Sequence, residues 1–198
     1  MILRQPYFLH KRIFSDEELT KISSIGEALE PQQAKTFNGN ARKNYRDSHI
    51  SWIENTQDTK WIYKKLIDAM TTVNQGAGWN FQHSVMEKLQ YTRYSETQHY
   101  NWHSDQKENP YTKDEVSMVE LHGLIRKISF SVLLNDDYEG GEFEFEYGLP
   151  DSDNRIKTIS PQKGLTILFP SFIMHRVKPV INGERRSLVG WVCGKPWV

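Results

Sequence analysis

The chain has 198 residues, of which 25 are Lys or Arg and 25 are Asp or Glu, so its formal net charge at pH 7 is zero. This balance argues against the strongly charged surface that dominates binding to nucleic acid or to anionic membranes. The lone Cys193 excludes an intramolecular disulfide, and no stretch approaches the roughly 18 apolar residues of a membrane span. The composition predicts one globular domain over residues 1–198, with no nucleic-acid or membrane partner.

The amino-terminal stretch MILRQPYFLHKRIF is interrupted by charges and by Pro6 before a signal-peptide apolar segment could form. We therefore expect a soluble protein in a reducing compartment, with a cytoplasmic location. The sequence says nothing about the oligomeric state.

Two amphipathic helices are expected within about residues 1–78, where they would form a helical support. Ser15 and Glu18 match a capping box and predict a helix from about Asp16 to Leu29. A second helix is predicted from Thr59 to Val73, because apolar residues recur there at helical spacing. The polar stretch 31–46 between them is expected to be a loop.

From about residue 79 to residue 198 the apolar residues alternate with a period of two, which is typical of strands. In EFEFEY, for example, Phe143 and Phe145 would lie on one face and the glutamates on the other. The predicted runs are 81–94, 127–135, 142–147, 165–169, 172–180 and 185–193. Many short strands separated by turns predict a mainly β core, a sandwich or jelly roll, with the early helices packed on one sheet.

The stretch YSETQHYNWHSDQ contains His103 and Asp105 two positions apart. On a strand, residues at i and i+2 point to the same face, so these two side chains could share a metal ion. The alternative is a pair of surface residues on an ordinary strand. The pair needs a third ligand before it indicates a metal site.

His175 is the candidate third ligand. It lies within a predicted strand, where an apolar residue would be expected if the position were only structural. Two histidines and one carboxylate on one side of a six-coordinate ion form the arrangement of non-haem Fe(II) oxygenases. A core or surface histidine is the alternative for His175 taken alone.

Arg185 and Arg186 follow on the next predicted strand. A guanidinium offers a rigid set of donors that matches a carboxylate, so one buried near the iron would suit an acidic co-substrate. The two arginines lie on opposite faces of the strand, and periodicity alone does not say which face is interior. A solvated arginine pair after a hairpin turn is the alternative.

Taken together, these residues resemble the 2-oxoglutarate and Fe(II)-dependent oxygenases, in the branch that includes the prolyl 4-hydroxylases. The resemblance covers about residues 91 to 191, roughly half of the chain. Its motifs are Tyr94, His103-Ser104-Asp105, Leu134-Asn135, Gly140-Gly141-Glu142, Gly164 with Phe169-Pro170 and His175, and Arg185-Arg186-Ser187 with Trp191.

The resemblance implies a double-stranded β-helix, the jelly roll of this superfamily, with iron held by His103, Asp105 and His175. It selects Arg185 as the partner of the distal carboxylate of 2-oxoglutarate. Three further residues are implied: Tyr94 on the same carboxylate, Ser187 as an added hydrogen bond, and Tyr100 near the iron as a substrate or co-substrate contact. The alternative for the two tyrosines is aromatic packing inside the mouth of the barrel.

The resemblance further implies a dioxygenase that uses Fe(II), 2-oxoglutarate and O2, with ascorbate as a candidate reductant, and that releases succinate and CO2. The expected substrate is a prolyl residue in a peptide or protein; a free amino acid or other small molecule is the second choice. Segments 107–122 and 36–49 are the candidates for aiming the substrate, or are solvent loops. The rival from another class is a non-catalytic, cupin-like jelly-roll binding module, in which the histidines need not converge and Arg185 faces solvent.

Overall fold

The computed structural model describes residues 3, 5–34, 45–147 and 155–197. Its helices are α1 (Asp16–Glu27), α2 (Lys60–Gly76) and the short 3-10 helix η1 (Val119–Leu121). None of the helices within these ranges is long and apolar enough to cross a membrane.

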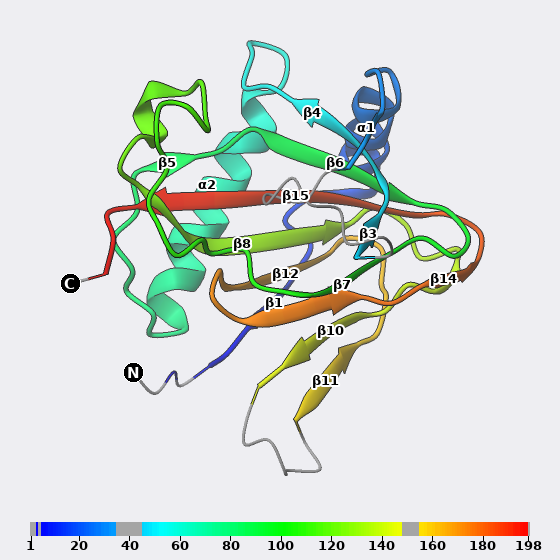
Figure 1. The fold of residues 1–198 in the computed structure, drawn as a ribbon. Coiled ribbons are helices and arrows are strands. Elements are labelled where there is room, and N and C mark those ends of the chain that lie inside the picture. Colours follow the sequence, from blue (N-terminus) through cyan, green and yellow to red (C-terminus); the bar gives the residue numbers. More distant parts are fainter. Residues whose placement is uncertain (1–2, 4, 35–44, 148–154, 198) are drawn as a thin grey trace.

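Most strands in the described ranges belong to two antiparallel sheets (Figure 1). The larger sheet has the order β1-β12-β8-β15-β6-β4-β2, and β5 also pairs with β15. Its strands are β1 (Phe8–Lys11), β2 (Gln32–Gln33), β4 (His49–Ile53), β5 (Val85–Met86), β6 (Leu89–Tyr94), β8 (Ile125–Leu133), β12 (Leu165–Pro170) and β15 (Arg185–Gly194).

The smaller sheet has the order β11-β10-β13-β7-β3, and a separate pair joins β14 to β9. The strands of the smaller sheet are β3 (Arg46–Asp47), β7 (His99–His103), β10 (Phe143–Glu146), β11 (Ile156–Ile159) and β13 (Met174–Val177). The pair consists of β9 (Glu139–Gly140) and β14 (Val180–Asn182). The result is the predicted mainly β jelly roll with flanking helices.

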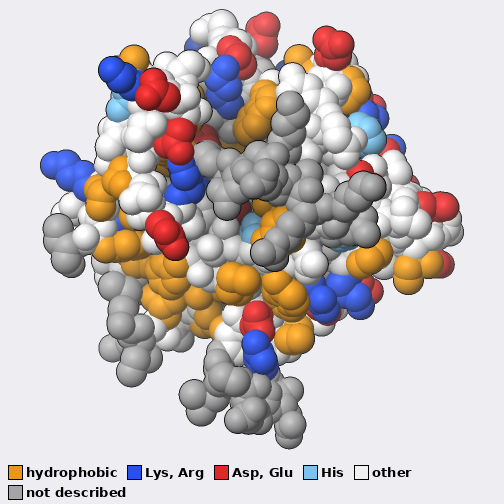
Figure 2. All heavy atoms as spheres, viewed as in Figure 1, with side chains coloured by type: hydrophobic (Ala, Val, Ile, Leu, Met, Phe, Trp, Pro, Cys, Tyr) orange, Lys and Arg blue, Asp and Glu red, His pale blue; other side chains and the backbone are white. Residues whose placement is uncertain are grey.

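The surface carries both signs of charge, as the zero net charge leads one to expect. Figure 2 shows acidic and basic side chains interspersed over the face that it draws.

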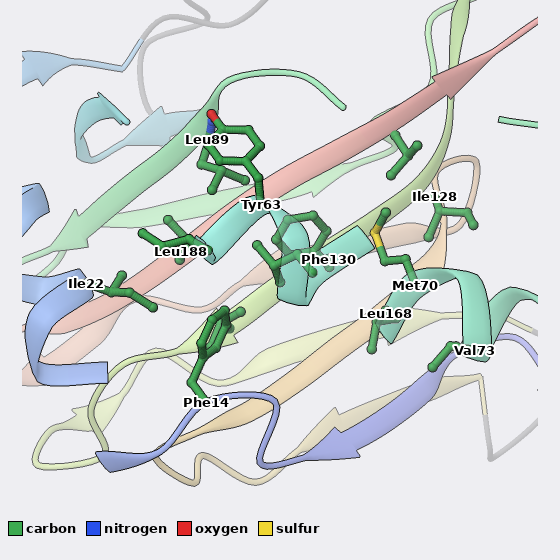
Figure 3. Close-up of a cluster of buried hydrophobic side chains, with 14 of the residues drawn as sticks. Phe14, Ile22, Tyr63, Met70, Val73, Leu89, Ile128, Phe130, Leu168 and Leu188 are labelled. Atoms are coloured by element: carbon green, nitrogen blue, oxygen red, sulfur yellow. The ribbon is translucent and has the colours of Figure 1, made fainter. Parts of the chain in front are cut away.

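The main apolar core lies between the helices and the larger sheet (Figure 3). Ile62, Leu66 and Met70 of α2 recur at helical spacing and are almost fully buried, together with Phe130 and Leu188 from the sheet. A second core fills part of the space between the two sheets. Because β8 lies between these two cores, every residue of Ile125–Leu133 is buried, and the strand contributes to both.

The capping box predicted at the start of α1 is present. The Ser15 Oγ accepts a hydrogen bond from the Glu18 backbone N–H at 3.3 Å, and the Glu18 Oε2 accepts one from the Ser15 N–H at 2.8 Å. α1 approaches β6 closely at Gly26, where an added Cβ would lie 2.3 Å from the Tyr91 ring. A side chain at this position would therefore push the helix away from the sheet.

The strand predictions differ from the structure in three places. The predicted run 81–94 forms strands only at β5 and β6, and the run 172–180 is divided between β13 and β14. Within the first 78 residues, β1 pairs with β12 and β4 pairs with β6, so this part of the chain adds strands to the larger sheet as well as helices. Strands of four or five residues, such as β1 and β4, carry too few residues for a clear period.

The glutamate face predicted for β10 is only partly exposed. Glu144 is buried because Arg176 of β13 donates to its Oε2 at 2.7 Å and Thr158 of β11 donates to its Oε1 at 3.0 Å. Both partners come from neighbouring strands that the alternation of one strand does not reveal.

The capping box generates a prediction about stability. Ser15→Ala removes the side-chain acceptor and should lower the free energy of unfolding by about 1 kcal/mol, measured by urea denaturation. The matched control is Ser24→Ala on the exposed side of the same helix, which should not lower stability because alanine favours a helix interior. Equal losses for the two variants would contradict this role of Ser15.

Candidate metal centre

The site lies in a cavity of about 930 Å³ between the two sheets. The larger sheet contributes residues from β4, β6, β8, β12 and β15, and the smaller sheet contributes residues from β3, β7, β10 and β13. A jelly roll thus leaves an open space where its two sheets face one another, and the candidate residues named from the sequence converge there.

His103 and His175 are neighbours because β7 and β13 pair. They are directly opposite each other in the antiparallel register, and their ring centroids are 4.1 Å apart. Strand pairing therefore brings together two histidines that are 72 positions apart in the sequence.

Both imidazoles are held in one orientation by backbone carbonyl groups. The Nδ1–H of His103 donates to the Asn101 carbonyl oxygen at 2.7 Å, and the Nδ1–H of His175 donates to the Ile173 carbonyl oxygen at 2.9 Å. Burial lowers the pKa of both imidazoles, most strongly that of His103, and so favours neutral rings. A neutral imidazole with a proton on Nδ1 presents a lone pair on Nε2, which is the form that binds metal ions.

Asp105 completes the group from just beyond the strand. β7 ends at His103, so the strand alternation used in the sequence argument does not extend to Asp105. The backbone N–H groups of Asp105 and Gln106 instead both donate to the Ser171 carbonyl oxygen at 2.9 Å. This turn directs the carboxylate back toward the histidines, with Oδ1 3.9 Å from the His103 Nε2 and Oδ2 3.5 Å from the His175 Nε2.

The Asp105 carboxylate is ionised despite its burial. Burial by itself raises the pKa of Asp105, but the protonated forms of His175 and His103, the Arg126 guanidinium and a hydrogen bond from Ser129 bring the pKa below its ordinary value. The group therefore offers two neutral nitrogens and one anionic oxygen, all within 4.8 Å of one another. This is the donor set that fits Fe(II) in the two-histidine, one-carboxylate arrangement.

Arg185 lies in the same cavity and is 1% exposed, whereas Arg186 is partly exposed and contacts Glu184 and Glu27. The Arg185 Nη1 donates to the Ser187 Oγ at 3.0 Å. Its Nε and Nη2 are buried with no hydrogen-bond partner, and no carboxylate forms an ion pair with it within the described part of the chain. A buried cation left unpaired in this way fits a ligand that brings a carboxylate.

The two candidate tyrosines occupy different parts of this cavity. Tyr94 lies opposite Arg185 in the β6–β15 register, with the Arg185 Cζ 5.5 Å from its ring centroid. Tyr100 stacks on the His103 ring, with centroids 3.5 Å apart, and burial raises the pKa of Tyr100. Tyr94 is thus placed beside the guanidinium, and Tyr100 beside the metal-ligand candidates.

The two segments considered for aiming the substrate contribute differently. Lys107, Glu108, Asn109 and Glu115 from segment 107–122 line the cavity. Residues 36–44 of segment 36–49 lie outside the described residues. Of the remainder, Arg46 also lines the cavity, with its Cζ 4.5 Å from the Tyr100 ring centroid.

Sequence reasoning missed the residues that surround Asp105. The Ser171 carbonyl orients its backbone, Ser129 bonds to its carboxylate, and the Arg126 Nη1 lies 4.0 Å from its Oδ1. Arg126 is itself paired with the buried Glu87. The available signal was Glu87 inside the predicted run 81–94 and Arg126 next to the predicted run 127–135, but nothing local relates one residue to the other.

Comparison with known proteins adds an independent finding. The sequence pattern of the 2OG-Fe(II) oxygenase superfamily matches residues 89–193, just over half of the chain. A PKHD-type hydroxylase of Synechococcus sp. (strain CC9902) is 37% identical over 95 residues, which are 47% of this chain and 35% of the relative. A PKHD-type hydroxylase of Alteromonas mediterranea is 34% identical over 106 residues, or 52% and 41% of the two chains. The chain therefore spans well under half the length of these relatives.

Solved structures resemble the fold over almost the whole chain. A viral collagen prolyl hydroxylase from Paramecium Bursaria Chlorella virus-1 has a TM-score of 0.68 at 18% identity, covering 96% of this chain and 97% of that one. A Pseudomonas putida prolyl-4-hydroxylase has a TM-score of 0.69 at 19% identity, covering 98% and 95%. A Trichoplax adhaerens prolyl hydroxylase, solved with a hypoxia inducible factor peptide, has a TM-score of 0.71 at 16% identity, covering 96% and 84%.

Proposed function

The chain belongs to the 2OG-Fe(II) oxygenase superfamily, and on this premise we propose that it is a 2-oxoglutarate-dependent dioxygenase that hydroxylates a prolyl residue in a peptide or protein. Fe(II) and 2-oxoglutarate, when bound, supply the chemistry that activates O2 and couples formation of succinate and CO2 to hydroxylation. The protein supplies the ligands, the orientation of the co-substrate and the cavity.

One observation carries this proposal. A buried guanidinium with unsatisfied donors lies in the same cavity as two neutral imidazoles and an ionised carboxylate. Burying the Arg185 donors or the Asp105 charge without a partner costs free energy. A metal cation bound at His103, Asp105 and His175 and a dianionic acid bound at Arg185 would satisfy both.

Each residue then has a defined role. His103 and His175 would hold the metal through Nε2, while the Asn101 and Ile173 carbonyl groups keep the rings from turning. Asp105 provides the anionic ligand that balances part of the metal charge. On the other side of the cavity, Arg185 would bind the distal carboxylate of 2-oxoglutarate, supported by Ser187 and Tyr94.

The assignment of a prolyl substrate rests on the names of the relatives and on the form of the site. The structural neighbours are prolyl hydroxylases, and one of them was solved with a peptide. The cavity of about 930 Å³ has room for a side chain in addition to a co-substrate. Free amino acids or other small molecules are the second candidate, because a cavity of this size would also admit them.

The cupin-like binding module is not favoured by the geometry. That alternative expects histidines that need not converge and an Arg185 that faces solvent. In the structure the histidine rings are 4.1 Å apart and Arg185 is 1% exposed.

Metal binding is the first test. The wild-type protein should bind Mn²⁺ in isothermal titration calorimetry, and His175→Ala should weaken binding at least about 100-fold, since even supporting residues around a metal site cost 10–100-fold. The matched control is His122→Ala, whose ring contacts the Val116 carbonyl away from the site. Unchanged Mn²⁺ affinity in His175→Ala would refute its role as a ligand.

Co-substrate binding is the second test. Adding 2-oxoglutarate to the Fe(II)-loaded protein without oxygen should produce a weak visible charge-transfer band. Arg185→Gln should raise the 2-oxoglutarate concentration needed for the band by about 30-fold or more, because truncating one partner of a buried charge pair costs at least about 2 kcal/mol. Arg186→Gln, one position along on the partly exposed face, should leave the titration unchanged; equal effects of the two substitutions would reject Arg185 as the carboxylate partner.

Substrate class is the third test. Proline-containing peptides should stimulate succinate formation above the level without substrate, and mass spectrometry should locate one added oxygen on the proline. Peptides with Ala in place of that proline serve as the control. Stimulation by free amino acids, together with unmodified peptides, would favour the small-molecule alternative.

A further inference from the structure

A buried carboxylate behind the cavity wall has four donors around it. Glu87, between β5 and β6, is 8% exposed. Its Oε1 accepts hydrogen bonds from the Arg126 Nε at 2.7 Å, the Tyr111 hydroxyl at 2.9 Å and the Cys193 thiol at 3.2 Å. Its Oε2 accepts a bond from the Arg126 Nη2 at 2.7 Å.

Arg126 thus lies between two carboxylates, those of Glu87 and of the metal-ligand candidate Asp105. Its bidentate partner is Glu87, and its Nη1 lies 4.0 Å from the Oδ1 of Asp105, beyond hydrogen-bond distance. The guanidinium is 9% exposed, and its Cζ lies 3.7 Å from the Trp191 ring centroid. Trp191 and Arg126 both line the cavity.

The other two donors around Glu87 are neutral. Burial raises the pKa of the Tyr111 hydroxyl and of the Cys193 thiol, so both keep their protons and remain donors. The Arg126 guanidinium is therefore the positive charge in this cluster of four residues, and it balances the Glu87 carboxylate.

This arrangement affects metal binding, because a guanidinium and a metal ion compete for the carboxylate oxygen atoms of Asp105. An arginine prefers a planar, bidentate approach to a carboxylate, and such an approach to Asp105 would occupy lone pairs that a metal ion needs. Glu87 engages Nε and Nη2 and so directs the planar group toward itself. Asp105 is left with Nη1 nearby but not bonded.

We propose that Glu87 is a positioning residue that holds the Arg126 guanidinium against Trp191 and keeps its Nη1 4.0 Å from the Asp105 carboxylate, beyond hydrogen-bond distance, so that the Asp105 oxygen atoms stay available to the metal. This inference rests on the proposed function, because it takes Asp105 as a metal ligand. Glu87 then has a measurable effect on metal affinity, although it lies outside the metal and co-substrate contacts.

The test measures Mn²⁺ affinity by isothermal titration calorimetry in three variants of the full chain. Glu87→Gln keeps the shape of the side chain but removes its charge, so Arg126 should turn toward Asp105 and Mn²⁺ binding should weaken about 10-fold or more, the range seen for residues that support metal ligands. Glu87→Gln combined with Arg126→Met removes the competing cation and should restore binding to within about 3-fold of wild type. A merely structural role for Glu87 would not produce this recovery.

Tyr111→Phe is the matched control. It removes one neutral donor from Glu87 without changing any charge or freeing Arg126, so Mn²⁺ affinity should stay within about 3-fold of wild type. Unchanged affinity in Glu87→Gln would overturn the inference. So would a double variant that binds Mn²⁺ as weakly as Glu87→Gln.

The double variant also covers the case in which Glu87→Gln does not fold. Breaking one side of a buried ion pair is strongly destabilising, whereas replacing both partners is often tolerated. Compared directly with wild type, the double variant should bind Mn²⁺ as tightly or more tightly; a loss of about 10-fold or more would overturn the inference, because Arg126 would then be supporting Asp105 itself. A wild-type protein that fails to bind Mn²⁺ would instead overturn the proposed function, and this inference with it.

Discussion

The pairing of β7 with β13 is the contact on which the site depends. It places His103 directly opposite His175 and gives both rings the same face of the smaller sheet. Since side chains alternate along a strand, a slip of one residue in this register would turn one ring out of the cavity. The two backbone carbonyl groups that hold the rings belong to the same two strands or their ends, so register and ring orientation are set together.

The buried charged residues of the cavity differ in whether the protein supplies a partner of opposite charge. Arg126 has a partner supplied by the protein, and Asp105 is ionised by its neighbours. Arg185 has no acidic partner in the described part of the chain. Buried charged side chains occur in proteins when they are paired or when they bind a ligand. Arg126 is paired with Glu87, whereas Arg185 would face a ligand.

The helical layer contributes to the site indirectly. α1 and α2 cover the outer face of the larger sheet, and their apolar side chains bury one side of β8 and β15. The opposite sides of these two strands line the cavity through Arg126, Ser131, Arg185 and Ser187. Packing on one face therefore holds in place the polar residues on the other, which is how a sheet keeps a polar site rigid.

Local sequence determined both helices, most of the long strands and the residue types of the site, because capping, helical spacing and alternation act over a few neighbouring residues. Only the tertiary structure decided which residues meet. Periodicity left Arg185 and Arg186 equivalent until the sheets buried one of them, and Asp105 reaches the histidines through a turn tied to Ser171 rather than along a strand. The contact of Glu87 with Arg126 joins positions 39 residues apart, and no local pattern encodes it, because strand register and burial depend on partners that are distant in the chain.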